Sequence, residues 1–516
     1  MKLLYVSTIV KNNSFGEVSR KYLKMFEKYS DWDIYLFTID GVENHKSEIS
    51  SKLNPIQYIP NYKKKINKNK VYNFYINGLY HLNDYILKIN PDIVLMLHND
   101  SDIYRYFNVL EEIRNVWEGK FVAFTPVDFE NPLDHIFRVK YDACITLNEW
   151  SVNQIKEIDI NYPVFSCPHI VDKFSKLDDI TIKQNKIKIY GNANKYIVGC
   201  VNANNGRKRL DLVINAFIAF YETNRDSILF IKTTKFEKGG ITTSFNLENF
   251  TKNYPIIIST EYLTTNELNI LYNTFDIMIN ATDGEGFGLT PFEAALSGTL
   301  SILPNNSSFT SLIEEEIPNY LIPCKKYPYE YARTAQSIYK TLNGEIFYSI
   351  YYDFKSYKNK TIVCKSFLNI VDDMQTYIVS KKMVPNGNVF PDMDKLLKAP
   401  WDDIQIQILI TSDLESLRYF LNWLTINKDI IWPGINRERD IISLKSLNSY
   451  IGTDAPRVGI IDTNDLCKKM NYYKKNPVEC DNDLIHLRNF TLKNYNEEAV
   501  WNKFSGIINH LVDSSH

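Results

Sequence analysis

The sequence predicts an α/β protein made of two doubly wound domains, each a mostly parallel sheet with helices on both faces. Short apolar runs alternate with amphipathic stretches from the first residue to Asp172, and the same alternation restarts near Tyr196. Such alternation is typical of βαβ units in a parallel sheet. Because ligands bind these sheets beyond the carboxyl ends of the strands, two facing domains predict an active site in the cleft between them.

The first domain, residues 1–172, contains six strand-like runs with helical patterns such as "EVSRKYLKMFEKY" between several of them. The runs are "KLLYVST", "DIYLFTI", "PDIVLML", "KFVAFTPV", "ACITLN" and "PVFSCP". The opening "MKLLYVSTIV" is short for a signal peptide and no small-residue cleavage site follows it, so we interpret it as the first buried strand. Residues 173–195 are polar and lysine-rich, which indicates a linker.

The second domain, residues 196–384, repeats this alternation of apolar runs and amphipathic stretches. The alternation weakens in a C-terminal extension, residues 385–516. The strand-like runs of the second domain are "YIVGCVNA", "SILFIKTT", "PIIIST", "DIMINA", "LSILPN" and "NYLIPC". The extension contains one strand and helix unit, "IQIQILITSDLESLRYFLNWL", and a clear last helix. Apolar residues recur in that helix at the spacing of one buried face, which predicts that it packs back on the body: Val500, Phe504, Ile507, Ile508 and Leu511.

The composition narrows the classes of partner and the cellular location. A chain of 516 residues exceeds one typical core, and its 44% hydrophobic and 23% charged residues are ordinary for globular domains. A net charge of −2 gives no support for a nucleic-acid partner. Seven scattered cysteines without a C-x-x-C pair suggest neither a disulfide framework nor a zinc site. We therefore expect a cytoplasmic protein without a transmembrane segment, and we leave peripheral membrane contact and the oligomeric state open.

The segment "TDGEGFGLTPFEAALSGT" places glycines and carboxylates between an apolar strand and a helix of small residues. A backbone turn explains Gly284, because glycine reaches positive φ without a clash. Gly286 and Gly288 flank a Phe beside a carboxylate, and a helix start with bare N–H groups binds anions. Phosphate is therefore the first expectation, with a purely structural turn as the alternative.

Two further features have a functional and a structural interpretation. Within "TPFE", Thr290 could be the N-cap of the helix, with Glu293 reaching back to close a capping box. Arg207, Lys208 and Arg209 open an amphipathic helix, where each cation opposes the helix dipole by roughly 0.3 to 1 kcal/mol. Three cations at that end favour an anion nearby over a solvated basic turn.

The stretch "YLTTNELNILYNTFDIMINATDGEGFGLTPFEAALSGT" resembles the retaining glycosyltransferases of the GT-B fold, glycosyltransferase family 4 in particular. Their signature is a Glu, seven residues and a second Glu, within E-G-F-G-L-x-x-x-E-A, and it is complete here as Glu285 to Glu293. The resemblance covers residues 196–323 closely. It covers the first domain more loosely, through "FGEVSR", "FTPVDFENP" and "CPHIVDKF".

The resemblance implies roles for individual residues. It assigns the nucleotide ribose to Glu293, the transferred sugar to Glu285, and the donor pyrophosphate to Lys208. The family's Arg falls near Ala203, which leaves open whether Arg207 takes its place. The donor-binding set that it implies is Gly16, Gly286, Phe287, Gly288, Leu289, Thr290 and Glu293.

Residues of the first domain are implied less directly. Many family members carry His-Asp after the strand that ends in "FTPVDFE", and here Val127 takes the His position while Asp128 remains. His98 and Asp100 follow the preceding strand and could face the same cleft. Gly16 could approach donor and acceptor or could form a simple turn, and "PHIVD" resembles a hinge element.

These features predict a retaining, metal-independent hexosyltransferase. It would move a sugar from a nucleotide diphosphate sugar, with UDP or GDP undecided, to an acceptor hydroxyl on a glycan, glycolipid or protein glycan, and would need no cofactor. Lys208, Arg207 and the "GFGL" amides would stabilise charge on the departing phosphate, with Glu285 and Asp128 as further catalytic candidates. The alternatives are an epimerase or phosphorylase on the same fold, and a non-catalytic scaffold that binds sugar nucleotides.

Overall fold

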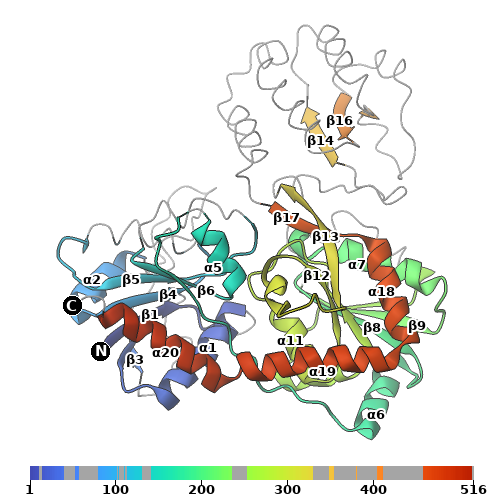
Figure 1. Cartoon of the computed structure of the whole chain (residues 1–516), viewed down its shortest axis with the longest axis horizontal. Coiled ribbons are helices and arrows are strands. Elements are labelled where there is room, and N and C mark those ends of the chain that lie inside the picture. Colours follow the sequence, from blue (N-terminus) through green and yellow to red (C-terminus); the bar gives the residue numbers. More distant parts are fainter. Residues whose placement is uncertain are drawn as a thin grey trace.

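Two seven-stranded sheets dominate the part of the chain that the structure describes (Figure 1). The structure is a computed structural model, and it describes residues 1–10, 14–39, 53–56, 79–100, 103, 110, 113–130, 141–157, 159–234, 253–328, 348–353, 379–380, 404–410 and 457–513. Within these ranges, no helix combines the length and the apolar character needed to cross a bilayer. The six cysteines in these ranges are free thiols.

The first sheet is parallel throughout, with the order β3-β2-β1-β4-β5-β6-β7. Alternate residues of β1 face opposite sides of it. Tyr5 packs in one apolar cluster with Tyr22 of α1, whereas Leu4 packs in another with Ile86 of α2. Helices therefore cover both faces. The elements are β1 (Lys2–Ser7), α1 (Ser14–Tyr29), β2 (Asp33–Thr38), β3 (Asn54–Pro55), α2 (Leu79–Ile89), β4 (Ile93–Leu97), β5 (Lys120–Phe124), β6 (Ala143–Thr146), α5 (Glu149–Lys156) and β7 (Val164–Ser166).

The second sheet has the order β10-β9-β8-β11-β12-β13-β17 and is parallel except for its last strand. The predicted α/β class with two doubly wound domains is thus confirmed. The elements are β8 (Tyr196–Val201), the 3₁₀ helix η4 (Gly206–Lys208), α7 (Leu210–Tyr221), β9 (Ser227–Lys232), β10 (Ile256–Ser259), α10 (Thr265–Asn273), β11 (Ile277–Ile279), α11 (Leu289–Leu296), β12 (Ser301–Asn305), the 3₁₀ helix η5 (Ser307–Leu312), β13 (Leu321–Pro328) and β17 (Arg457–Ile461).

Strand β17 brings residues from late in the sequence into the second sheet. It pairs antiparallel with β13, with Cys324 opposite Ile461, so the sheet contains residues from both sides of the boundary that the sequence suggests at 384/385. Between them in sequence, β14 (Tyr348–Asp353), β16 (Ile404–Ile410) and β15 (Val379–Ser380) form a separate antiparallel sheet. The helix expected after "IQIQILI" lies outside the described residues.

The segment that the sequence suggests as a linker contains a helix, α6 (Asp179–Tyr190). Asp178 caps it by accepting a hydrogen bond from the Thr181 amide at 2.9 Å, and Gly191 ends it at φ 74°. Lys186 of α6 forms an ion pair with Asp276 at 2.7 Å, which anchors the helix to the second domain. The alternating "ITIKQNKIKIY" lacks helical apolar periodicity, so only the caps signal this helix.

Three helices complete the chain: α18 (Thr463–Lys475), α19 (Pro477–Asn494) and α20 (Glu497–Asp513). Figure 1 shows α19 along the second domain and α20 along the first. The five residues that α20 buries are the five that its spacing indicates, Val500, Phe504, Ile507, Ile508 and Leu511. Between the two helices, the Tyr495 carbonyl accepts a hydrogen bond from the Val171 amide at 2.8 Å.

Candidate functional site

The order of the second sheet reverses between β8 and β11, and the two segments that follow these strands carry opposite charges. In open α/β sheets, ligands bind outside the carboxyl ends of the strands at such a switch point. The segment after β8 contains Arg207, Lys208 and Arg209, and the segment after β11 contains Asp283 and Glu285. The topology therefore places the basic turn beside the glycine and acid loop.

Arg209, one of the three cations, is neutralised by carboxylates of the protein itself. Arg209 forms ion pairs with Asp211 at 2.8 Å and with Asp283 at 3.2 Å, and its side chain is buried. Burial raises the pKa of Asp283 to about 7, against the attraction of Arg209. Arg209 also occupies the left-handed region at φ 48° as the N-cap of α7. It is thus a structural residue that holds the loop after β11 against the start of α7.

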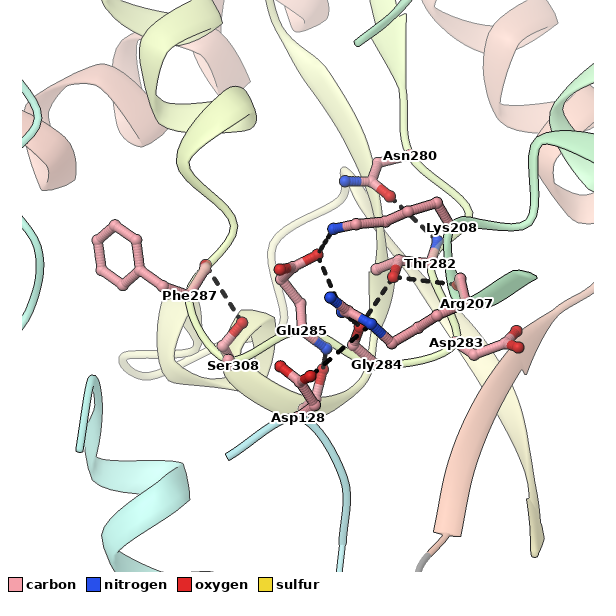
Figure 2. A network of polar contacts seen from close by, with 12 residues as sticks. Asp128, Arg207, Lys208, Asn280, Thr282, Asp283, Gly284, Glu285, Phe287 and Ser308 are labelled. Carbon is pink, nitrogen blue, oxygen red and sulfur yellow. Dashed lines mark hydrogen bonds and ion pairs between the residues drawn. The ribbon is translucent and has the colours of Figure 1, made fainter. Parts of the chain in front are cut away.

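Lys208 and Arg207 converge on the carboxylate of Glu285 (Figure 2). The Lys208 ammonium forms an ion pair with Glu285 Oε2, and Arg207 Nη1 lies 3.4 Å from the same oxygen. Burial lowers the pKa of Lys208, although Glu285 opposes this effect. Burial also disfavours the charge of Glu285, but the two cations outweigh it and lower the pKa of Glu285. The three side chains therefore form one ionic network in a largely desolvated place.

Arg207 also reaches the first domain. Its Nε lies 3.7 Å from Asp128 Oδ2, and its guanidinium donates a hydrogen bond to the Gly284 carbonyl. The structure thereby brings four of the predicted site residues into one network, Asp128, Arg207, Lys208 and Glu285.

The glycines of the loop allow the two domains to approach closely. A Cβ on Gly284 would lie 2.2 Å from the Asp128 carbonyl oxygen, and one on Gly286 would lie 2.3 Å from the Pro126 Cβ. Asn148, which caps α5 in the first domain, donates through Nδ2 to the Gly286 carbonyl at 2.8 Å. Sequence reasoning missed Asn148, because its side chain gives only an N-cap signal locally. At these two positions the glycines serve a contact between domains.

Helix α11 begins without a side-chain cap, so the capping-box alternative for "TPFE" is wrong. Its N-cap is Gly288 at φ 79°, where a Cβ would lie 2.7 Å from the Phe309 ring, and Leu289 and Thr290 form its first turn. Glu293 Oε2 instead accepts a hydrogen bond from the Tyr272 hydroxyl at 2.9 Å. Gly288 is thus the residue at the helix start, and the Glu293 side chain is not used to cap the backbone.

Charged residues of the first domain act on the carboxylate of Glu293. Burial raises its pKa, while Lys21 of α1 lowers it, and Asp172 and Glu17 raise it. Lys21 forms an ion pair with Asp172 at 2.8 Å. The carboxylate assigned to ribose by resemblance is therefore bound to Tyr272 of α10 and influenced electrostatically by Lys21 and Glu17 of α1.

Other loop atoms are engaged within the protein. The Phe287 ring packs against His169, Phe292 and Tyr495, with ring centroids 4.9 to 5.3 Å away, and its carbonyl accepts from the Ser308 hydroxyl at 3.2 Å. The Glu285 amide donates to Ser307 Oγ at 2.8 Å. These contacts hold the loop after β11 in place, and neither His169 nor the two serines was expected there.

The candidates of the first domain have mixed placements. Gly16 lies within α1, where a Cβ would meet the Val10 carbonyl oxygen at 2.0 Å, so close packing accounts for this glycine. Val127 is buried in an apolar cluster of the first domain. His98 stacks on Phe15 at 4.8 Å. Burial raises the pKa of Asp100 to about 7.

The described residues contain no group of three or more His, Cys, Asp and Glu side chains that could hold a metal ion. Independence from metal stays a prediction, which chelation tests.

Residues 182–343, less than a third of the chain, match the family model described as Glycosyl transferases group 1. The matched segment includes Arg207, Lys208, Glu285 and Glu293. No curated protein matches the chain.

Several solved structures are similar in fold. Sucrose-phosphate synthase from Thermosynechococcus elongatus is 14% identical over 63% of this chain and 86% of its own, with a TM-score of 0.49. HepE of Anabaena in complex with UDP-glucose is 12% identical over 63% of this chain and 85% of its own, with a TM-score of 0.46. A glycosyltransferase from Rickettsia africae is 14% identical over 63% of this chain and 84% of its own, with a TM-score of 0.44. These likenesses concern the fold alone.

Proposed function

We propose that the chain is a cytoplasmic, retaining hexosyltransferase that moves a sugar from a nucleoside diphosphate sugar to an acceptor hydroxyl of a glycan or glycoconjugate. The family match over residues 182–343 supports glycosyl transfer as the class of reaction. The paired glutamates of the second domain support the resemblance to glycosyltransferase family 4. The scattered free thiols favour a reducing compartment.

The convergence of Lys208 and Arg207 on Glu285 at the switch point is the observation on which this proposal rests. A diphosphate brought to the two cations would compete with Glu285 for them. Its oxygens would take over the charge compensation, and the Glu285 carboxylate would then be available to the hydroxyls of the sugar. The two cations thus suit an anionic ligand, and the Glu285 carboxylate balances their charge in the absence of ligand.

The same cations suit the difficult step of the reaction. As the bond from sugar to phosphate breaks, negative charge develops on the departing phosphate and the sugar becomes oxocarbenium-like. Preorganised cations in a desolvated place stabilise that charge more than they would in water. In the proposed reaction the departing phosphate accepts the proton of the acceptor hydroxyl, and neither a metal nor a cofactor takes part.

A panel of nucleotides and sugar nucleotides tests the proposal. Thermal unfolding is measured with UDP, GDP, UDP-glucose and GDP-mannose, because a ligand in excess stabilises the folded chain by RT ln(1 + [L]/Kd). We expect the nucleotides of one base, either uracil or guanine, to raise the Tm. With the sugar nucleotide of that base, we expect sugar transfer to an added acceptor, both with and without EDTA. The anomeric configuration of the product, read by NMR, tests retention.

The alternatives give different products. An epimerase would isomerise the donor without acceptor, and a phosphorylase would require inorganic phosphate. A scaffold would bind the donor but leave it intact after long incubation. Absence of any shift across the panel would contradict the proposal as a whole.

A further inference from the structure

Helix α19 carries an apolar stripe on its solvent side. Val478, Ile485 and Leu492 are 69%, 55% and 49% exposed. They stand seven residues apart, which is about two helical turns, so they lie in one line along the helix. Leu487 and Thr491 are fully buried on the side that packs on the second domain. The helix therefore has one apolar contact toward the body and a second apolar line pointing away from it.

The polar residues beside the stripe form a pattern that is complementary to itself. Asp481 and Asn482 precede Ile485 by four and three residues, and Arg488 and Asn489 follow it by three and four. Residues three and four positions away lie on the same helical face, so these four flank the central Ile485. Asp481 and Arg488 lie along one edge of the stripe, and the two asparagines lie along the other.

We propose that α19 is a homodimer surface on which a second copy of this chain docks, with the two helices antiparallel about a twofold axis at Ile485. Such an axis places Ile485 against the partner's Ile485 and Val478 against the partner's Leu492. It also places Asp481 beside the partner's Arg488, and the same pair forms again by symmetry. A twofold interface uses one patch twice, so it requires a patch complementary to itself.

Helix α6 shows that apolar spacing alone does not define this surface. Ile180 and Ile187 are 70% and 54% exposed and also stand seven residues apart. Lys183 and Gln184 lie between them, without an acidic residue in the same interval. Antiparallel pairing of α6 about the middle of this interval would bring Lys183 close to its own symmetry copy with no acid to balance it. The charge pattern thus selects α19, and α6 supplies a matched control.

The size of the surface indicates a weak dimer. The line from Val478 to Leu492 is about 21 Å long at 1.5 Å per residue. A single helix pair of this length falls at the low end of specific interfaces, below about 1,200 Å², where transient complexes are found. We expect a dimer that forms with concentration and weakens with salt, since its two ion pairs are at the rim.

Sedimentation velocity of the full chain over a wide concentration range tests the proposal by charge reversal. Asp481→Arg and Arg488→Asp, each alone, bring like charges together and should raise the dimer Kd about tenfold or more, whereas the double reversal restores it. Ile180→Ser/Ile187→Ser on α6 should leave it unchanged. Since all these positions are exposed, unchanged circular dichroism and Tm show that the variants are folded.

Position 485 gives a second test, which reports on the geometry of the dimer through cross-linking. Ile485→Cys places two thiols at the twofold axis, so mild oxidation should yield a reducible covalent dimer faster than the wild type does. Charge reversal at Asp481 should slow this cross-linking. A chain that stays monomeric at all concentrations, a dimer indifferent to these substitutions, or Ile485-dependent binding to phosphatidylcholine vesicles without dimerisation would overturn the proposal.

Discussion

Arg207 and Lys208 are neighbours in sequence, yet the structure gives them different partners. The Lys208 ammonium pairs with Glu285 inside the second domain, and its side chain is 11% exposed. Arg207 links Glu285 and the Gly284 carbonyl to Asp128 of the first domain. Lys208 is therefore the better candidate for the departing phosphate, and Arg207 couples the contact between domains to the charge of the site.

Lys208→Ala should lower kcat by about a hundredfold to a thousandfold and weaken donor binding much less, because the cation stabilises charge that develops in the transition state. Arg207→Ala should have a smaller effect on kcat, and the double variant should be worse than either. We would measure kcat and donor Kd with and without EDTA. Arg225→Ala, which removes an exposed cation of the same domain, is the control. Full activity in the double variant, or activity lost on chelation, would contradict this assignment.

Glu293→Gln should lower donor affinity while the fold persists, because a ribose-binding carboxylate accepts hydroxyl hydrogen bonds that an amide accepts less well. Since Thr290 caps nothing in the structure, Thr290→Ala should change stability by less than the roughly 1 kcal/mol that a lost cap costs. Tyr272→Phe removes the hydroxyl bound to Glu293 and serves as the comparison. Isothermal titration with the nucleotide and thermal unfolding separate the two effects. Normal nucleotide binding by Glu293→Gln would show that the carboxylate is structural.

His169 introduces acid sensitivity at the junction of the domains. Burial, aided by Lys21, lowers its pKa to about 3 from 6.5, so it is neutral when folded but protonated in the unfolded chain below pH 6.5. The unfolded state then binds more protons, and stability falls as the pH drops from 6.5 toward 3, by up to about 1.4 kcal/mol per pH unit. Urea unfolding at several pH values should show a shallower acid loss in His169→Gln than in the wild type. Parallel pH profiles would mean that His169 does not contribute.

At the scale of elements, most of the parallel strands were predictable because they are short apolar runs, whereas β3 (Asn54–Pro55) is a parallel strand without such a run and was not predicted. The run "DIMINA" contains β11 (Ile277–Ile279), and "KFVAFTPV" contains β5 (Lys120–Phe124). Strand β17 was not predicted, because an antiparallel edge strand far along the sequence gives only the short run "RVGII". Its place depends on a tertiary contact: the Gly459 amide donates to the Asp283 carbonyl at 2.9 Å.

The same limit applies to the candidate site. The glycines and glutamates were visible as a pattern, but the sequence could not show that Arg209 is neutralised by Asp211 and Asp283. Nor could it show that Gly286 lies against Pro126, more than a hundred residues away. The first contact depends on how the segments after β8 and β11 meet, and the second on how the two domains meet. Local sequence encodes neither.

Gly288→Ala tests whether the start of α11 requires glycine for both its backbone and its packing. At φ 79° a side chain costs about 1 to 2 kcal/mol, and the Phe309 ring 2.7 Å from the new Cβ adds about 1 to 3 kcal/mol of crowding. Gly191→Ala is a matched control, because φ is 74° there and nothing lies within 4 Å of the Cβ. Denaturant unfolding should show a clearly larger loss for Gly288→Ala. Equal losses of stability in the two variants would mean that only the backbone conformation, and not packing against Phe309, requires a glycine at position 288.

For the whole molecule, α20 is a second connection between the domains, because it continues from α19 on the second domain and packs on the first. Phe504 is fully buried and contacts the rings of Tyr22, Phe26 and Phe124 in the first domain. Lys120 of β5 donates to the Leu511 carbonyl near the end of α20 at 2.6 Å. The first domain thus completes its core with residues that come last in the chain.

Phe504→Ala should therefore destabilise the first domain selectively. Removing a buried Phe typically costs about 3 to 5 kcal/mol, and here the cavity opens between α20 and α1. Hydrogen exchange should become faster in α1 and β5 than in α7 and β9, because local opening reports the stability of each region. Lys503→Ala is the control, since its exposed pair with Glu149 contributes within about 1 kcal/mol. Uniform acceleration in both domains would mean that they unfold as one unit and that α20 does not stabilise the first domain separately.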